Sequence, residues 1–285
     1  MNTQILTKMA FLLFLVSLLI APAPAAARSS DSGGHTNKGV RYARQKKYDQ
    51  AISEFTKAID AQPSDPKNYT NRAMAYQMSG KPTKAINDYS KVIELRPKDA
   101  DAYSNKGQLE IQQKKLDAAI TDLTRALELN PKDTKARRYR AYAFLSKQQW
   151  QKAAEDYSAV IKQSPDDIGA YERRGYAYRN SGKYDQAIPD FTKVVQARPK
   201  DPEAYRRRGL TYRLKLDYAR AADDFRKVLE LKPNDADAKM RLKYVETKLR
   251  EVPLIRPTPT PARGRETAQK QRSLVSPTPT PSSGR

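Results

Sequence analysis

Asparagine, tyrosine and arginine side chains recur at one position of this sequence, every 34 residues. This column reads Asn37, Asn71, Asn105, Tyr139, Arg173 and Arg207. Further basic and aromatic residues stand on the same stretches, namely Arg138, Tyr142, Tyr176, Arg179, Arg206 and Arg213. Guanidinium groups bind carboxylates or phosphates through paired hydrogen bonds and stack on aromatic rings. The later part of the column therefore indicates a basic ligand-binding surface, although a solvated cationic face would have the same composition.

The groups that enzymes use for acid–base or covalent chemistry are nearly missing. The chain has no Cys, and His35 is its only histidine. Catalysis and metal binding both need several positioned groups, whereas His35 follows Gly33 and Gly34, where an ordinary surface residue is expected. The sequence has no glycine-rich phosphate loop, and its carboxylates recur in register instead of marking one site. We therefore expect no enzyme activity, no metal and no cofactor.

The charge balance is strongly basic. The 285 residues include 54 Lys and Arg against 32 Asp and Glu, which gives a net charge of +22. Such an excess favours acidic proteins, nucleic acid or anionic envelope polymers as partners. Solubility alone is the alternative explanation.

The first 27 residues are expected to be an export signal. Lys8 precedes the apolar run 10–20, and the small residues Ala25 and Ala27 suit the shallow pockets of a signal peptidase. We predict cleavage after Ala27 and a periplasmic or secreted protein. An uncleaved membrane anchor is the alternative, but the apolar run is shorter than the roughly 20 residues that span a bilayer.

Proline residues recur at an interval of 34, which identifies an array of repeats. They are Pro63, Pro97, Pro131, Pro165, Pro199 and Pro233. Between them, stretches such as 102–113 and 117–129 place apolar residues three and four apart, as an amphipathic helix requires. Each repeat is therefore predicted to be a hairpin of two helices. A small residue in each first helix leaves room for the second helix: Gly39, Ala73, Gly107, Ala141, Gly175 and Gly209.

Two further columns indicate ion pairs within the scaffold. Basic residues precede the small residue of each first helix: Lys38, Arg72, Lys106, Arg140, Arg174 and Arg208. Acidic residues occupy one column of the second helices: Glu54, Asp88, Asp122, Asp156, Asp190 and Asp224. We expect pairs within or between hairpins, exposed to solvent and worth about 0 to 1 kcal/mol each.

The runs 171–178 (YERRGYAY) and 184–188 (YDQAI) resemble tetratricopeptide repeats. The resemblance covers about residues 32–235 and implies an all-α fold, a right-handed superhelical α-solenoid of six helical hairpins whose first helices line a concave groove. It also implies that Asn37, Asn71 and Asn105 hydrogen-bond the backbone of an extended peptide, since an amide offers donors and acceptors. That asparagine is simply common in such repeats is the other interpretation. The carboxylate clamp of some family members cannot be completed here.

The predicted domain organisation follows from these signals. It comprises a signal peptide at 1–27, a linker at 28–34, the array at 35–251, and a disordered tail rich in Pro, Thr and Arg at 252–285. The array divides into repeats at about 32–65, 66–99, 100–133, 134–167, 168–201 and 202–235, with a capping helix at 236–251. The tail contains the near-duplicates RPTPTPARGR and SPTPTPSSGR, which suit either a spacer or a contact segment.

The predicted function is a protein–protein interaction scaffold that binds an extended peptide or protein, with the later part of the groove favouring acidic side chains. Charge-driven binding of an anionic polymer, such as an envelope polysaccharide, lipid headgroups or nucleic acid, is the alternative. Nucleic acid is the less favoured partner, because no nucleic-acid-binding motif is present. The oligomeric state is left open.

Overall fold

The described part of the chain, residues 25–251 of a computed structural model, consists of thirteen α-helices and contains no strand. Residues 1–24 and 252–285, with the apolar signal segment and the Pro-rich tail, lie outside the described residues. The helices form six hairpins and a final helix, which confirms the all-α repeat fold. The hairpins are α2 (Ala25–Arg44) with α3 (Tyr48–Ala61), α4 (Pro66–Met78) with α5 (Pro82–Leu95), α6 (Ala100–Gln112) with α7 (Leu116–Leu129), α8 (Thr134–Ser146) with α9 (Trp150–Gln163), α10 (Ile168–Asn180) with α11 (Tyr184–Ala197), and α12 (Pro202–Leu214) with α13 (Tyr218–Leu231), followed by α14 (Ala236–Glu251).

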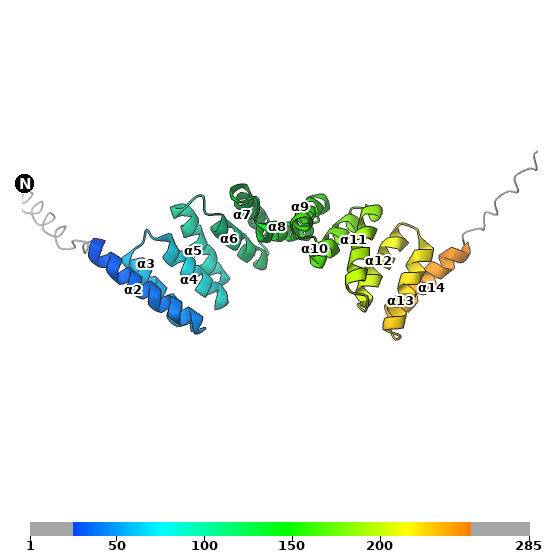
Figure 1. Cartoon of the computed structure of the whole chain (residues 1–285), viewed down its shortest axis with the longest axis horizontal. Helices are drawn as coiled ribbons and strands as arrows, with labels where there is room; N and C mark the ends of the chain where they lie inside the picture. The colour runs from blue at the N-terminus through cyan, green and yellow to red at the C-terminus, as the bar shows by residue number, and fades with distance from the viewer. Residues whose placement is uncertain (1–24, 252–285) are drawn as a thin grey trace, which may run out of the picture.

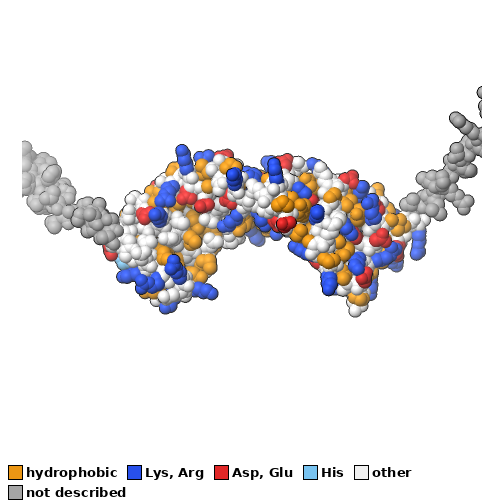
Figure 2. All heavy atoms as spheres, viewed as in Figure 1, with side chains coloured by type: hydrophobic (Ala, Val, Ile, Leu, Met, Phe, Trp, Pro, Cys, Tyr) orange, Lys and Arg blue, Asp and Glu red, His pale blue; other side chains and the backbone are white. Residues whose placement is uncertain are grey.

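The hairpins stack in chain order into an arch. Each helix packs on the next, and first helices of neighbouring hairpins also meet, as α6 and α8 do. In Figure 1 the first helices α8 and α10 lie toward the hollow of the arch, below α7 and α9. Figure 2 shows the hollowed underside between the two arms, with Lys and Arg side chains along the whole face. Among the described helices, none combines the length and apolarity needed to cross a bilayer.

An aspartate cap starts each first helix after that of the first hairpin. The caps are Asp65, Asp99, Asp133, Asp167 and Asp201, each of which accepts a hydrogen bond from a backbone N–H two or three residues on. Asp235 does the same for α14, and the N–H of Ala238 lowers its pKa to about 2. Such caps contribute about 1 kcal/mol each. They follow every periodic proline by two residues, a signal that the sequence analysis missed.

The core lies between the two helices of each hairpin. A large side chain of the second helix is fully buried there in every hairpin: Phe55, Tyr89, Leu123, Tyr157, Phe191 and Phe225. It packs against the small residue of the first helix, and a Cβ added to Gly107 would lie 2.6 Å from Leu123 Cγ. Close approach therefore explains the small residues, as predicted. Ala replaces Gly only at Ala73 and Ala141, which are the hairpins that carry Tyr89 and Tyr157.

The turn inside each hairpin uses one residue with left-handed backbone. Its φ lies between 57° and 76° at Lys46, Gly80, Lys114, Gln148, Gly182 and Leu216. Side chains with a Cβ adopt this region at a cost that glycine avoids. Four of the six turns therefore hold a non-glycine residue in a conformation that favours glycine.

The first hairpin departs from the predicted boundaries. Helix α2 begins at Ala25, so the linker predicted at 28–34 is wrong. Contacts with α3 and α4 hold this helix: Ser32 is buried and donates to Ala58 O of α3 at 3.1 Å, and Asn68 of α4 donates to Ser32 Oγ at 3.1 Å. The predicted cleavage after Ala27 lies within this helix and stays a prediction.

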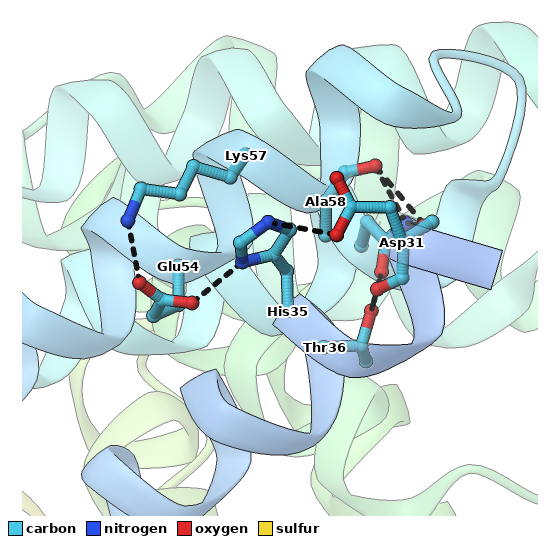
Figure 3. A network of polar contacts seen from close by, with 8 residues as sticks. Asp31, His35, Thr36, Glu54, Lys57 and Ala58 are labelled. Carbon is cyan, nitrogen blue, oxygen red and sulfur yellow. Dashed lines mark hydrogen bonds and ion pairs between the residues drawn. The ribbon is translucent and has the colours of Figure 1, made fainter. Parts of the chain in front are cut away.

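His35 takes part in the same packing. It is not the ordinary surface residue that was expected, because its side chain is 18% exposed and lies between Glu54 at 2.7 Å and Asp31 at 3.3 Å. Figure 3 shows the imidazole directed at both carboxylates, with Lys57 on the far side of Glu54. His35 stands at the position that Tyr69 occupies in the next hairpin, so it fills a scaffold position.

The final helix closes the array. Ala238 and Val245 of α14 are buried, whereas Met240 and Tyr244 are 63% and 45% exposed. Lys243 stands where the preceding hairpins have Gly or Ala. A lysine there would hold a second helix away, which fits the predicted capping role.

Candidate ligand-binding groove

A ladder of ion pairs builds the scaffold beneath the groove. Arg72, Arg140, Arg174 and Arg208 each bind the paired aspartate through two hydrogen bonds of 2.7 to 3.0 Å. Each also donates to a hydroxyl of the preceding hairpin, as Arg174 does to Ser158 at 3.1 Å. The predicted pairing is thus confirmed for these four hairpins, and it works within and between hairpins.

The prediction that these pairs are exposed is wrong. The carboxylate side chains are 4 to 7% exposed and the arginines 17 to 19%. Aromatic rings cover the guanidinium groups: Arg174, for example, lies 5.6 Å from the Tyr171 ring centre and 5.8 Å from that of Tyr178. The reason is that the first-helix tyrosines fold over the charge, which the residue types alone did not reveal. Burial raises the pKa of Asp190 although Arg174 lowers it, so desolvation of this pair is substantial.

Two hairpins vary the ladder. In the first, Glu54 contacts His35 and Lys57. In the third, Lys106 lies 2.8 Å from Asp122 and 3.6 Å from Glu110, and Glu110 is 4% exposed. Burial, and then the charge of Asp122, raise the pKa of Glu110 to about 7. One lysine therefore serves two buried carboxylates at this point of the array.

The amide pocket lies between the second and third hairpins and has a volume of about 270 Å³. It brings together Asn71 of α4 and Asn105 of α6, two residues of the predicted column. Its other lining residues are Lys67, Thr70, Tyr89, Arg96, Asp99, Asp101 and Ala102. Burial raises the pKa of Tyr89 to about 12, so its phenol stays protonated at neutral pH. The pocket thus offers amide and phenol groups that suit a peptide backbone.

The arginine pocket lies between the fourth and sixth hairpins and has a volume of about 630 Å³. It brings together five predicted residues, Tyr142, Arg173, Tyr176, Arg179 and Arg207. Leu145, Ser146, Gly169, Glu172 and Arg198 complete its lining. Glu172 and Arg198 were not predicted from the sequence. Their signal was weak, because Arg198 lies beyond the end of α11 and Glu172 is a single acidic residue among basic neighbours.

The charges of the arginine pocket are unevenly matched. Glu172 contacts Arg198 at 2.9 Å and also pairs with Arg207. Arg173 lies 5.4 Å from the Tyr142 ring centre, and Arg179 lies 5.2 Å from that of Tyr176. Burial lowers the pKa of Arg179. One carboxylate therefore faces four guanidinium groups.

The remaining predicted residues lie outside both pockets. Asn37 is exposed on α2. Arg138 pairs with Asp167, the cap of α10, at 2.9 Å, and Arg206 pairs with the α14 cap Asp235 at 2.6 Å. Arg213 stacks on Tyr244 of α14 at 5.7 Å. Within residues 25–251, no three potential ligand side chains gather in a way that could hold a metal ion.

Comparisons with known proteins identify the tetratricopeptide repeat family. Sequence profiles described as tetratricopeptide repeat match residues 34–65, 66–99, 100–133, 136–167 and 173–236. No curated protein sequence matches the chain significantly.

Solved structures of similar fold include two MamA proteins and YrrB. A MamA crystal structure is 27% identical, with a TM-score of 0.57 over 60% of this chain and 93% of that chain. MamA from Desulfovibrio magneticus RS-1 is 23% identical, with a TM-score of 0.55 over 60% of this chain and 97% of its own. YrrB, described as a TPR protein with an unusual peptide-binding site, is 22% identical, with a TM-score of 0.61 over 68% and 97%. At such identities the last two show the fold alone.

Proposed function

The chain belongs to the tetratricopeptide repeat family, and we propose that it is an interaction scaffold that holds an extended polypeptide in the groove of its first helices. One observation carries the proposal: the amide pocket joins Asn71 and Asn105 from successive hairpins, with Tyr89 also in its lining. Side-chain amides repeated at the hairpin spacing can hydrogen-bond a peptide backbone whatever its side chains. The role is binding, with no chemical step.

Photo-crosslinking in intact cells tests the groove. A photoreactive residue at Asn105 is expected to capture a polypeptide partner, whereas one at Thr121, exposed on the second helix α7, is not. Replacing Asn71→Ala in the chain labelled at position 105 should reduce the yield. Equal capture at both positions, or none at position 105, would contradict groove binding.

We also propose that the protein works outside the cytoplasm. The support is the sequence of the first 27 residues, with Lys8, the apolar run 10–20 and the small residues Ala25 and Ala27. N-terminal sequencing of the protein from its native cells tests the idea. A mature chain that begins at Arg28 is expected, and a chain that retains residues 1–27 in the cytoplasm would refute it.

An anionic polymer is the second candidate partner, and the arginine pocket together with the charge of +22 favours it. Binding of this kind depends steeply on salt, because each neutralised phosphate or sulfate releases counterions. Arg173→Gln, Arg207→Gln and Arg213→Gln should then each lower the slope of log affinity against log salt. A flat response would exclude this partner.

A further inference from the structure

We propose that the arginine pocket is a carboxylate-binding subsite of the groove. It would take an acidic side chain of the bound polypeptide, or its C-terminal carboxylate, between Arg173, Arg179 and Arg207. The inference rests on the proposed function, because the subsite is part of the groove that holds the polypeptide. It adds the chemistry by which this end of the groove selects its ligand.

Unmatched positive charge is the first observation. Arg179 is half-buried between Tyr176 and Phe191, at 5.2 and 5.8 Å from the two ring centres, and it contacts no carboxylate in the described part of the chain. Arg173 likewise has a ring, that of Tyr142, as its neighbour. The scaffold arginines differ, because each of them is bound to a buried aspartate. A partly desolvated guanidinium without an acid gains most from an incoming anion.

The second observation is that a carboxylate of the chain itself, that of Glu172, already binds arginines of this pocket. Its carboxylate binds Arg198 at 2.9 Å and also pairs with Arg207, while the lining of the pocket leaves Arg173 and Arg179 facing the same space. A ligand carboxylate would bind between Arg173 and Arg179, as the carboxylate of Glu172 binds Arg198 and Arg207. Glu172 also competes with that ligand for Arg207 and adds a negative charge beside it. Removing the charge of Glu172 should therefore strengthen binding, whereas removing that of Arg179 should weaken it.

Trp150 makes the pocket observable. It is the only tryptophan of the chain, and its ring lies edge-on to that of Tyr176, with ring centres 5.9 Å apart. Its fluorescence should therefore change when a ligand enters between Tyr142 and Tyr176. Three probes separate the sources of a carboxylate: an end-blocked Glu-Ser repeat peptide, the matching Gln-Ser peptide, and the Gln-Ser peptide with a free C-terminus.

Saturable binding of either carboxylate-bearing peptide, and weaker binding of the end-blocked Gln-Ser peptide, would support the subsite. Arg179→Gln should weaken binding about tenfold or more, as expected for a charge-assisted hydrogen bond. Glu172→Gln should tighten it about threefold, since a like charge is removed. Arg125→Gln changes the net charge equally on the exposed surface of α7 and should leave binding unchanged.

Opposite results would overturn the subsite. Weaker or unchanged binding by Glu172→Gln would contradict the subsite. This outcome does not depend on whether the Arg179 variant folds. Equal losses from Arg125→Gln and Arg179→Gln would reduce the effect to net charge. If a phosphoserine peptide binds more than about tenfold tighter than the Glu-Ser peptide, the subsite binds phosphate instead of carboxylate. If both Glu-Ser and Gln-Ser peptides bind equally, the subsite fails while groove binding stands; the proposed function fails separately if position 105 captures no polypeptide.

Discussion

The amide and arginine pockets lie on one scaffold but differ in chemistry. In the second and fourth to sixth hairpins, the same arginine-to-aspartate ladder joins the helices. The residue before the ladder position lines a pocket in four hairpins, and it changes from Asn71 and Asn105 in the amide pocket to Arg173 and Arg207 in the arginine pocket. Two adjacent residues of one helix therefore have separate tasks. One fixes the hairpin, and the other sets what the groove binds, so the ligand chemistry can change along the array while the fold stays the same.

The largest effect on stability is expected at Arg173 and Arg174, two neighbouring arginines with separate tasks. Arg174→Ala should lower the free energy of unfolding by about 2 to 4 kcal/mol, because the buried carboxylate of Asp190 loses its counter-charge. Arg173→Ala should change it by less than about 0.5 kcal/mol, since Arg173 is exposed. Urea denaturation followed by circular dichroism measures both.

The two variants are controls for each other, because they remove the same side chain from neighbouring positions. Binding of an acidic peptide should show the reverse order, with a larger loss for Arg173→Ala in whatever fraction remains folded. Similar losses of stability from the two changes would mean that scaffold and groove are not separated in this way.

A second prediction concerns the small residues under the two pockets. The hairpins with a phenol pair Ala73 with Tyr89 and Ala141 with Tyr157, whereas the third pairs Gly107 with Leu123. Gly107→Ala should cost about 1 to 3 kcal/mol of unfolding free energy, because the new Cβ would lie 2.6 Å from Leu123 Cγ and 3.2 Å from the Ala119 carbonyl oxygen.

Gly34→Ala is the matched control in helix α2, where a Cβ meets nothing within 4 Å. It should stabilise the protein by about 0.5 to 1 kcal/mol, because alanine favours helix. Thermal melts of both variants test the pair. A Gly107→Ala variant as stable as its parent would show that the third hairpin accommodates the added Cβ beside Leu123.

The sequence was sufficient for the periodic part of this organisation. The interval of 34 predicted the hairpins, and the columns with Arg174 and Asp190 predicted which charges meet. The interval alone did not reveal burial, because Arg174 is covered by Tyr171 and Tyr178, three and four residues away on the same helix, while Asp190 reaches it from α11. It also gave no basis for joining Glu172 to Arg198, since one lies on a first helix and the other follows a second helix of the same hairpin.

Non-periodic contacts explain the error at the N-terminus. Asp31 stands at the register position of the aspartate caps, such as Asp65, so a helix that begins after it would have matched the other hairpins. The buried contact of Ser32 with Ala58 and the contact of His35 with Glu54 hold the residues that follow Asp31, and α2 extends through Asp31 back to Ala25. A repeat pattern describes what the hairpins share, and it carries no information on a segment that only one hairpin has.

A third prediction tests the junction between the two pockets, where Glu110 and Asp122 share Lys106. The folded protein raises the pKa of Glu110 from 4.5 to about 7, so it binds a proton that the unfolded chain releases. The resulting stability is complete below about pH 4.5 and is lost as the pH rises to about 7. Glu110→Gln should therefore be more stable than its parent at pH 8, by about 1 to 2 kcal/mol after screening by water and by Lys106.

Urea denaturation across this pH range measures the difference. The advantage of Glu110→Gln should shrink as the pH falls and should vanish below about pH 4.5, because the protonated carboxyl and the amide then carry the same charge. A constant difference at all pH values would instead indicate an effect of shape. No difference at pH 8 would show that Lys106 fully compensates both carboxylates.

The smallest effect on stability is expected at the turns inside the hairpins, which lie outside both pockets. Gln148 joins α8 to α9 with a φ of 57°, whereas Gly182 joins α10 to α11 with a φ of 76°. Gln148→Gly should stabilise the protein by about 0.5 kcal/mol, because relief of about 1 kcal/mol of left-handed strain is partly offset by the greater freedom of glycine in the unfolded chain. Gly182→Ala should destabilise it by a similar amount through the backbone alone, since the added Cβ meets nothing within 4 Å.

Opposite shifts in the thermal midpoint, with acidic-peptide binding unchanged in both, would show that the turns act on stability independently of the groove. Equal shifts of the same sign would contradict this account of the turns.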